Sequence, residues 1–278
     1  MAISTKKHHT AVIEGTTYRA AIMPDPEPTN PRTEYDNVGV MTCWHSRYDL
    51  GDKHEHKGVD DWLGSLLVDI QDVERLSEAV ESIAQADDYI AKDWQQLEGD
   101  VVEQSGLTGE LPAEVYRDFL IELCANGLTK AAREVVRDLA EHYHVILPLY
   151  LYDHSGITMS TGAFSCPWDS GQVGYIHVSY KQARKEYGDL PQAGTPEERA
   201  KIAKYLTGEV DDYDDYLTGN LYGFSIEKAE GCEHCGNVEW EHVDSCWGFH
   251  GYDVEKNGML EHVDDQFADL LKKAPIIY

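Results

Sequence analysis

The chain has 278 residues, and its 42% hydrophobic and 10% aromatic content is enough to build a core rather than a disordered acidic segment. It carries 51 Asp and Glu residues against 23 Lys and Arg residues, for a net charge of -28. No basic run is longer than two residues, as at Lys6-Lys7, so the chain lacks the basic clusters with which proteins bind nucleic acid directly.

The sequence also bears on the compartment. No segment approaches the roughly 20 apolar residues that a membrane span needs, and the N-terminal residues show no apolar secretion signal. The 6 cysteines are too few and too scattered for a disulfide scaffold. We therefore expect a soluble cytoplasmic protein with reduced thiols and no membrane partner.

The excess acid is concentrated in two stretches. Residues 59–110 hold 14 acidic and 2 basic residues, and residues 205–278 hold 17 acidic and 4 basic residues, whereas the rest is nearly balanced. Separated acidic stretches favour an electrostatic field that attracts a cationic partner. The alternative is that these stretches are solvated helix faces that serve solubility alone.

The first half of the chain predicts two strands followed by helices. The strands are expected over residues 17–23 and 38–44. From Val59 to Val80 the apolar residues recur at spacings of three and four, which predicts an amphipathic helix, and a further helix is expected over 84–97. The polar face of these helices carries Asp69, Asp72, Glu78, Glu81, Asp87, Asp88 and Asp93. A pair of helices is expected after Pro112, broken at Asn126-Gly127.

The second half alternates between strands and helices. Thr195 is predicted to cap a helix that has Pro196 in its first turn, Glu198 at the capping-box position and an end near Thr207. The acidic run 209–216 follows this helix. The remaining elements are strands over 145–151, 157–161, 173–179, 221–227 and 238–243, a short helix over 181–187, and a closing helix over 259–271.

These elements predict an α+β fold, with a mixed sheet and amphipathic, strongly acidic helices. We expect a single domain over residues 1–278. It would contain an acidic helical element at about 59–110 and an acidic C-terminal part at about 205–278.

Several blocks are rich in Cys, His, Asp and Trp. They are NVGVMTCWHSRY at 37–48, DHSGITMSTG at 153–162, FSCPWDSGQVGYI at 164–176 and DSCWGFHGY at 244–252. A hydrolase or transferase could use such residue types for nucleophilic and acid–base catalysis, although no known local signature fits. The catalytic candidates are Cys43, His45, Asp153, His154, Cys166 and Asp169. The alternative is that Cys and Trp pack in the core and the glycines form turns.

These blocks resemble those of a family of uncharacterised proteins encoded by bacteriophages and mobile elements. The resemblance implies an accessory protein acting inside a bacterial host cell. It carries over no catalytic residues, because no activity is established for that family.

A structural zinc site is a further possibility. Cys232 and Cys235, in the sequence Cys-Glu-His-Cys-Gly, have the spacing of a zinc knuckle, and Cys246 and His250 are the candidates that would complete it. The alternative is a hairpin loop with two reduced thiols.

The favoured function is that of a binding protein, an inhibitor of a host defence or nucleic-acid-binding protein that has a basic surface. Its acidic surface would occupy that surface as DNA does. The predicted partner-binding residues are Asp69, Asp72, Glu78, Asp87, Asp88, Asp211, Asp212, Asp214 and Asp215, all expected to face solvent. The alternatives are the enzyme above and an acidic scaffold protein without inhibitory activity.

Overall fold

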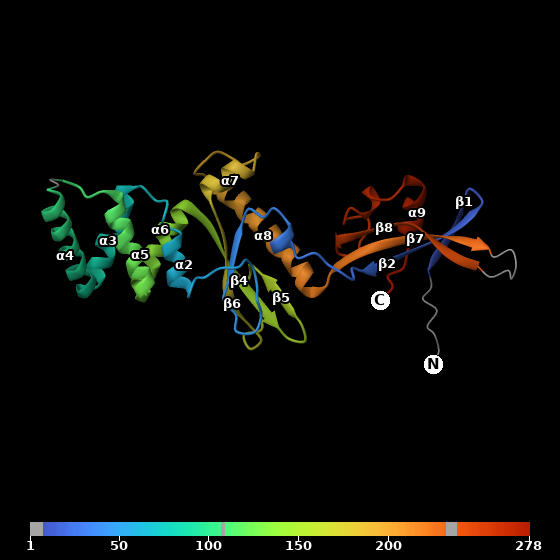
Figure 1. The fold of residues 1–278 in the computed structure, drawn as a ribbon, viewed down its shortest axis with the longest axis horizontal. Helices are drawn as coiled ribbons and strands as arrows, with labels where there is room; N and C mark the ends of the chain where they lie inside the picture. The colour runs from blue at the N-terminus through green and yellow to red at the C-terminus, as the bar shows by residue number, and fades with distance from the viewer. Residues whose placement is uncertain (1–7, 107–108, 232–237) are drawn as a thin grey trace. The chain divides into compact units, whose positions relative to one another are not determined.

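The computed structural model describes residues 8–106, 109–231 and 238–278 (Figure 1). The chain forms two compact units, where the sequence led us to expect one domain. Unit 1 contains Met1–Asn37, Tyr150–Gln172 and Thr207–Tyr278, and unit 2 contains Val38–Leu149 and Val173–Leu206. Strands β4 and β6 and helix α8, whose bounds are given below, each contribute residues to both units.

Unit 1 contains a four-stranded antiparallel sheet with the strand order β1-β2-β7-β8. Its strands are β1 (His9–Ile13), β2 (Thr16–Pro24), β7 (Leu221–Gly231) and β8 (Val238–His250), and the short helix α1 (Pro31–Glu34) follows β2. Phe224 and Ile226 of β7 are completely buried. They pack in a cluster that also contains Met259 and Leu271 from the C-terminal segment.

The C-terminal segment differs from the expected closing helix. Residues 259–271 form two 3-10 turns, η1 (Met259–Glu261) and η2 (Asp265–Phe267), and a single turn of α-helix, α9 (Ala268–Leu271). Asp264 caps η2 by accepting a hydrogen bond from the backbone N–H of Gln266. The apolar residues of the segment are still buried, so their spacing predicted the burial correctly and the regular helix wrongly.

Unit 2 is largely a helical assembly. It contains α2 (Val59–Ser65), α3 (Val73–Ala86), α4 (Asp88–Ser105), α5 (Ala113–Asn126) and α6 (Lys130–Tyr143). Helix α3 packs against α4, α5 and α6, and α2 packs against α5 and α6 (Figure 1). Trp62, Leu76, Leu120 and Val136 are at most 1% exposed and lie in one apolar cluster. The expected helix pair after Pro112 is confirmed.

The expected helix from Val59 to Val80 is instead two helices. The backbone leaves the α-helix after Ser65, and Asp72 starts α3 by accepting a hydrogen bond from the backbone N–H of Arg75. Leu67 and Ile70 lie in the connection and remain buried. Because the connection keeps its apolar residues on the core side, the helical spacing of the sequence continues across it.

The second sheet has the strand order β3-β6-β4-β5, with β3 (Val40–Cys43), β6 (Ser170–Ser179), β4 (His144–Asp153) and β5 (Ile157–Ser160). Helix α7 (Tyr180–Glu186) follows β6, and α8 (Pro196–Thr218) is longer than expected because it continues through the acidic run. The α+β class is confirmed, although the sheets are antiparallel rather than mixed. None of the helices in the described ranges is long and apolar enough to cross a membrane.

Candidate functional site: an acidic face on α3 and α4

Helix α3 separates apolar from acidic residues. Leu76 and Val80 are fully buried against the helical core. Glu74, Glu78 and Glu81 recur at spacings of four and three, which places them on one side of the helix, and all three are exposed. The sequence therefore forms one buried stripe and one carboxylate stripe on the same helix.

Helix α4 extends the acidic surface and packs on the helical core through Trp94, with Ile90, Leu97 and Val101 partly buried against the same core. Trp94 is its one buried residue, and the indole ring packs on Tyr116 and Phe119 with both ring centroids at 5.1 Å. The exposed carboxylates of this helix include Asp93, Glu98, Asp100 and Glu103. We call these four residues, together with Glu74, Glu78 and Glu81, the α3–α4 acidic face. On α4, Asp93, Asp100 and Glu103 lie within about 80° of one another, and Glu98 lies on the other side of the helix.

The carboxylates of the α3–α4 acidic face are not neutralised by partners. None of the seven side chains forms a hydrogen bond or an ion pair with another residue in the described part of the chain. Burial raises the pKa of the Tyr116 phenol, and the charges of Glu110, Glu98 and Glu81 raise it further. Glu81 of α3 and Glu98 of α4 therefore both lie close enough to Tyr116 to act on its hydroxyl.

The charge density of α4 can be compared with that of DNA. The helix has 5 acidic residues among 18, over a length of about 27 Å. This amounts to one charge per ~5 Å, whereas one DNA strand carries one per ~3.4 Å of helix axis. The helix therefore approaches, without matching, the linear charge density of a nucleic-acid strand.

Not all of the predicted partner-binding residues of this region are available for binding. Asp69, Glu78 and Asp88 are exposed. Asp72 and Asp87 instead cap α3 and α4, and Asp72 also accepts a hydrogen bond of 2.9 Å from the Tyr143 hydroxyl. The hydrogen bond from the Arg75 backbone N–H is the largest cause of the lowered pKa of Asp72, and the bond from Tyr143 lowers this pKa further. Its carboxylate is thus engaged in the fold.

The acidic run of α8 belongs to unit 1. Unlike the α3–α4 acidic face, it contains carboxylates that form hydrogen bonds within the fold. Asp214 accepts hydrogen bonds from the Thr158 hydroxyl at 2.8 Å and from the Met159 backbone N–H at 2.7 Å. Asp215 accepts from the Asn220 amide at 2.7 Å and lies 3.0 Å from Nδ1 of His250. The expectation that these two carboxylates face solvent is wrong, because they connect α8 to β5 and β8.

The other two aspartates of this run are less constrained. Asp212 lies 3.7 Å from Nδ1 of His250, and its side chain is 50% exposed. Asp211 is exposed, and its pKa is raised by desolvation and by the charges of the neighbouring aspartates. The sequence reasoning treated both acidic stretches alike, whereas the structure engages Asp214 and Asp215 in hydrogen bonds and leaves the carboxylates of the α3–α4 acidic face exposed. Glu98, Asp100 and Glu103 were missed because the predicted helix ended at residue 97.

Some of the catalytic candidates lie together in unit 1. Oδ2 of Asp169 is 3.3 Å from Nδ1 of His154 and 3.7 Å from Sγ of Cys166, and the Asp169 carbonyl accepts a hydrogen bond from the Asp153 backbone. The histidine and the thiol therefore share one carboxylate oxygen, and no hydrogen bond joins them. The His154 side chain is 64% exposed. This arrangement does not position an imidazole as a base for the thiol.

The remaining catalytic candidates, Cys43 and His45, belong to unit 2. Cys43 is buried in β3, and the His45 ring stacks on Tyr48 with centroids 5.0 Å apart. Nδ1 of His45 accepts hydrogen bonds from the backbone of Arg47 and Tyr48. Both contacts serve the local fold.

The zinc candidates Cys232 and Cys235 lie outside the described residues. Cys246 and His250 are described, and both lie in the continuous strand β8. Because a strand rises about 3.3 Å per residue, Cys246 lies about 26 Å along β8 from Val238, the first residue of the strand. Within the described ranges no group of three or more His, Cys, Asp or Glu residues could hold a metal ion.

No protein-family model, curated protein or solved structure matches this chain.

Proposed function

We propose that this protein is an accessory binding protein that occupies a basic, nucleic-acid-binding surface of a bacterial host protein and so inhibits it. The observation that carries the proposal is the α3–α4 acidic face, on which seven exposed carboxylates have no partner among the described residues. Unpaired charges of one sign attract an oppositely charged surface over about a Debye length and accelerate association.

The blocks at 37–48, 153–162, 164–176 and 244–252 support the proposed cellular setting. Their resemblance to proteins of bacteriophages and mobile elements supports an accessory role in the cytoplasm of an infected cell. The nearly complete absence of basic residues from α3 and α4, where Arg75 and Lys92 stand alone, argues against direct nucleic-acid binding by this face.

The experiment is affinity capture from bacterial lysate with three forms of the protein. One is the wild type. The second is the triple variant Glu74→Gln, Glu78→Gln, Glu81→Gln on the acidic face. The third is a matched control, Glu255→Gln, Glu261→Gln, Asp265→Asn, which removes three exposed carboxylates of unit 1.

We expect the wild type and the control to retain the same nucleic-acid-binding proteins at low salt, as identified by mass spectrometry. The acidic-face variant should retain them several-fold less. Added double-stranded DNA should release them, because it competes for the same basic surface. Equal capture by the acidic-face variant, or capture that DNA leaves unchanged, would show that the proposal is wrong.

A further inference from the structure

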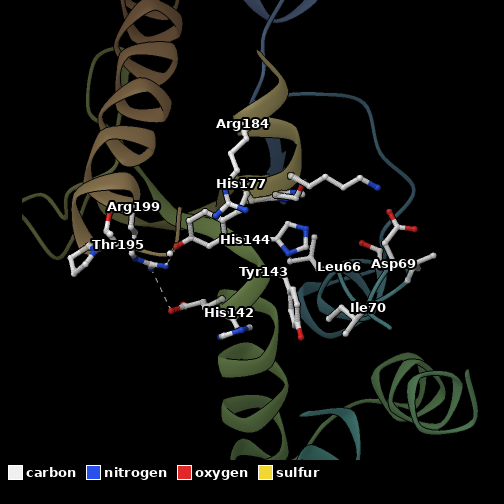
Figure 2. A pocket seen from close by; sticks show the side chains of 18 residues that line it. Leu66, Asp69, Ile70, His142, Tyr143, His144, His177, Arg184, Thr195 and Arg199 are labelled. Atoms are coloured by element: carbon white, nitrogen blue, oxygen red, sulfur yellow. Dashed lines mark hydrogen bonds and ion pairs between the residues drawn. The ribbon is translucent and has the colours of Figure 1, made fainter. Parts of the chain in front are cut away.

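Unit 2 contains a cavity of about 840 Å³ that plays no part in the proposed function (Figure 2). Its lining comes from the connection 65–70, the end of α6, the first residue of β4, the end of β6 with α7, and the start of α8. Sites for small organic ligands are typically about 300–1,000 Å³. The cavity therefore has the size of a small-molecule site.

One wall of the cavity is apolar. Leu66, Val68 and Ile70 line it, with the ring of Tyr143 beside them and the carboxylate of Asp69 in the same segment. Figure 2 shows Leu66, Ile70 and Tyr143 on the same side of the cavity. A wall of aliphatic and aromatic groups is suited to one face of a planar ring.

Two neutral imidazoles line the interior of the cavity. Burial lowers the pKa of His144 and that of His177, the latter to about 3. Nδ1 of His144 lies 3.3 Å from the carbonyl oxygen of Ala140, which can only accept, so this nitrogen carries the proton. The Nε2 atom of the neutral ring is then an acceptor, and it requires an N–H or O–H donor in any ligand that pairs with it.

Three basic side chains also line the cavity, against the charge of the chain as a whole, together with the carboxylates of Asp69 and Glu141. Lys181, Arg184 and Arg199 all line the cavity. Arg184 is engaged with Glu198, and Arg199 lies 3.6 Å from Glu141. Lys181 has no ion pair within the described part of the chain and is exposed.

Helix α8 contributes the positive end of its dipole, which is partly offset by the Glu198 carboxylate that accepts from the Gly194 backbone. Its N-terminal residues lie at the cavity, with Gly194, Thr195 and Pro196 in the lining, and the helix is 23 residues long. The positive end of a helix dipole favours an anionic group. In Figure 2, Thr195 and Arg199 lie across the cavity from Leu66 and Asp69. The cavity thus has an apolar wall, a hydrogen-bond acceptor and three basic side chains in its lining, together with the carboxylates of Asp69 and Glu141.

We propose that this cavity binds a nucleoside monophosphate, with the base against the apolar wall, an N–H of the base donated to His144, and the phosphate near Lys181 and the start of α8. A nucleotide combines the planar apolar ring, the N–H donors and the dianionic group that the three parts of the cavity require. This inference is independent of the α3–α4 acidic face.

The test is isothermal titration calorimetry with AMP, CMP, GMP and UMP, with the corresponding nucleosides, and with inorganic phosphate. We expect at least one nucleotide to bind at a 1:1 ratio with a Kd on the order of 10–100 µM. Its nucleoside and phosphate alone should bind at least about five-fold more weakly. No saturable binding by any nucleotide overturns the proposal, as does phosphate or a nucleoside binding as tightly as the nucleotide.

Two variants locate the site. Lys181→Glu should weaken nucleotide binding about five-fold or more and leave nucleoside binding unchanged. Lys185→Glu is the matched control on the same helix: its side chain is 73% exposed and it is not part of the described lining, so it should bind as the wild type does. His144→Phe keeps the ring and removes the acceptor, so it should weaken nucleotide and nucleoside alike. Equal effects of Lys181→Glu and Lys185→Glu would place the ligand elsewhere.

Discussion

The carboxylate of Asp214 accepts a hydrogen bond of 2.7 Å from the backbone N–H of Met159, and this contact joins α8 to β5 within unit 1. The same oxygen accepts a second hydrogen bond from the hydroxyl of Thr158. Because Met159 is 2% exposed, its N–H has no access to bulk water as an alternative partner. An aspartate in the most acidic run of the chain is therefore a structural residue.

Asp214→Ala should lower the free energy of unfolding by about 1–3 kcal/mol, since it leaves a buried N–H without a partner. Urea denaturation followed by circular dichroism measures this change. Asp211→Ala is the control, because Asp211 is exposed and its pKa is raised by its acidic neighbours. The control should be neutral or slightly stabilising. Equal losses in both variants would contradict the assigned difference between the two aspartates.

The buried carboxyl of Glu198 should make the stability of the protein depend on pH. It is completely buried and accepts hydrogen bonds from Arg184 at 2.6 and 2.9 Å and from the Gly194 backbone at 2.7 Å. The Arg184 guanidinium is the largest cause of the lowered pKa of this carboxyl. A carboxyl with a lowered pKa in the folded state stabilises the protein above its unfolded value of 4.5, and this contribution is lost as the pH falls below it.

Glu198→Gln should therefore be less stable than the wild type by about 1.5–3 kcal/mol at pH 7. The difference should shrink between pH 4.5 and pH 3, as the wild type loses its contribution. Chemical denaturation at a series of pH values measures it, with the exposed neighbour Glu197→Gln as the control. A difference that is independent of pH would show that the carboxylate form is not what stabilises the fold.

Trp94 holds α4 in place. Its ring packs on Tyr116 and Phe119, and no other residue of this helix is buried. Trp94→Ala should cost about 3–5 kcal/mol and increase amide hydrogen exchange throughout α4. Tyr89→Ala, at a side chain that is 80% exposed on the same helix, should leave exchange unchanged. If α4 remained protected in Trp94→Ala, its position would depend on other contacts.

The sequence predicted most helices and strands, because apolar spacing reports burial. It did not predict the break between α2 and α3, since Leu67 and Ile70 keep the helical spacing through a non-helical connection. The Thr195 cap was predicted correctly, and its hydroxyl accepts from the Glu198 backbone at 3.2 Å. Local patterns of this kind depend on residues that are close in sequence.

The candidate sites were harder to predict for the opposite reason. Asp214 and Met159 are 55 residues apart, and no local pattern distinguishes a hydrogen-bonded aspartate from a free one. Glu198 was predicted for a capping box, and its carboxylate accepts from the backbone N–H of Gly194, one residue before the Thr195 cap; its pairing with Arg184, 14 residues away, was not predicted. The cavity combines five separate segments, so its residue types converge only in the folded chain.

The imidazole of His177 should also make the stability of the protein depend on pH. Burial lowers its pKa to about 3, and the nearby charges of His144 and His56 act in the same direction. Its ring also packs edge-on against Trp62, at 5.5 Å. The folded protein therefore keeps this imidazole neutral, whereas the unfolded chain takes up a proton near pH 6.5, the ordinary pKa of histidine. The contribution of the neutral His177 ring to the free energy of unfolding is fully present above pH 6.5. It is lost as the pH falls from 6.5 towards 3, at up to about 1.4 kcal/mol per pH unit.

His177→Phe keeps a ring against Trp62 and removes the titrating group. Its free energy of unfolding should fall less steeply than that of the wild type between pH 6.5 and pH 4, as measured by urea denaturation at half-unit intervals. The NMR signals of the His177 ring in the wild type should also stay constant from pH 8 to pH 5. Parallel pH profiles for the two proteins, or a ring that titrates near pH 6.5 in the folded state, would contradict a neutral His177 imidazole in the folded protein.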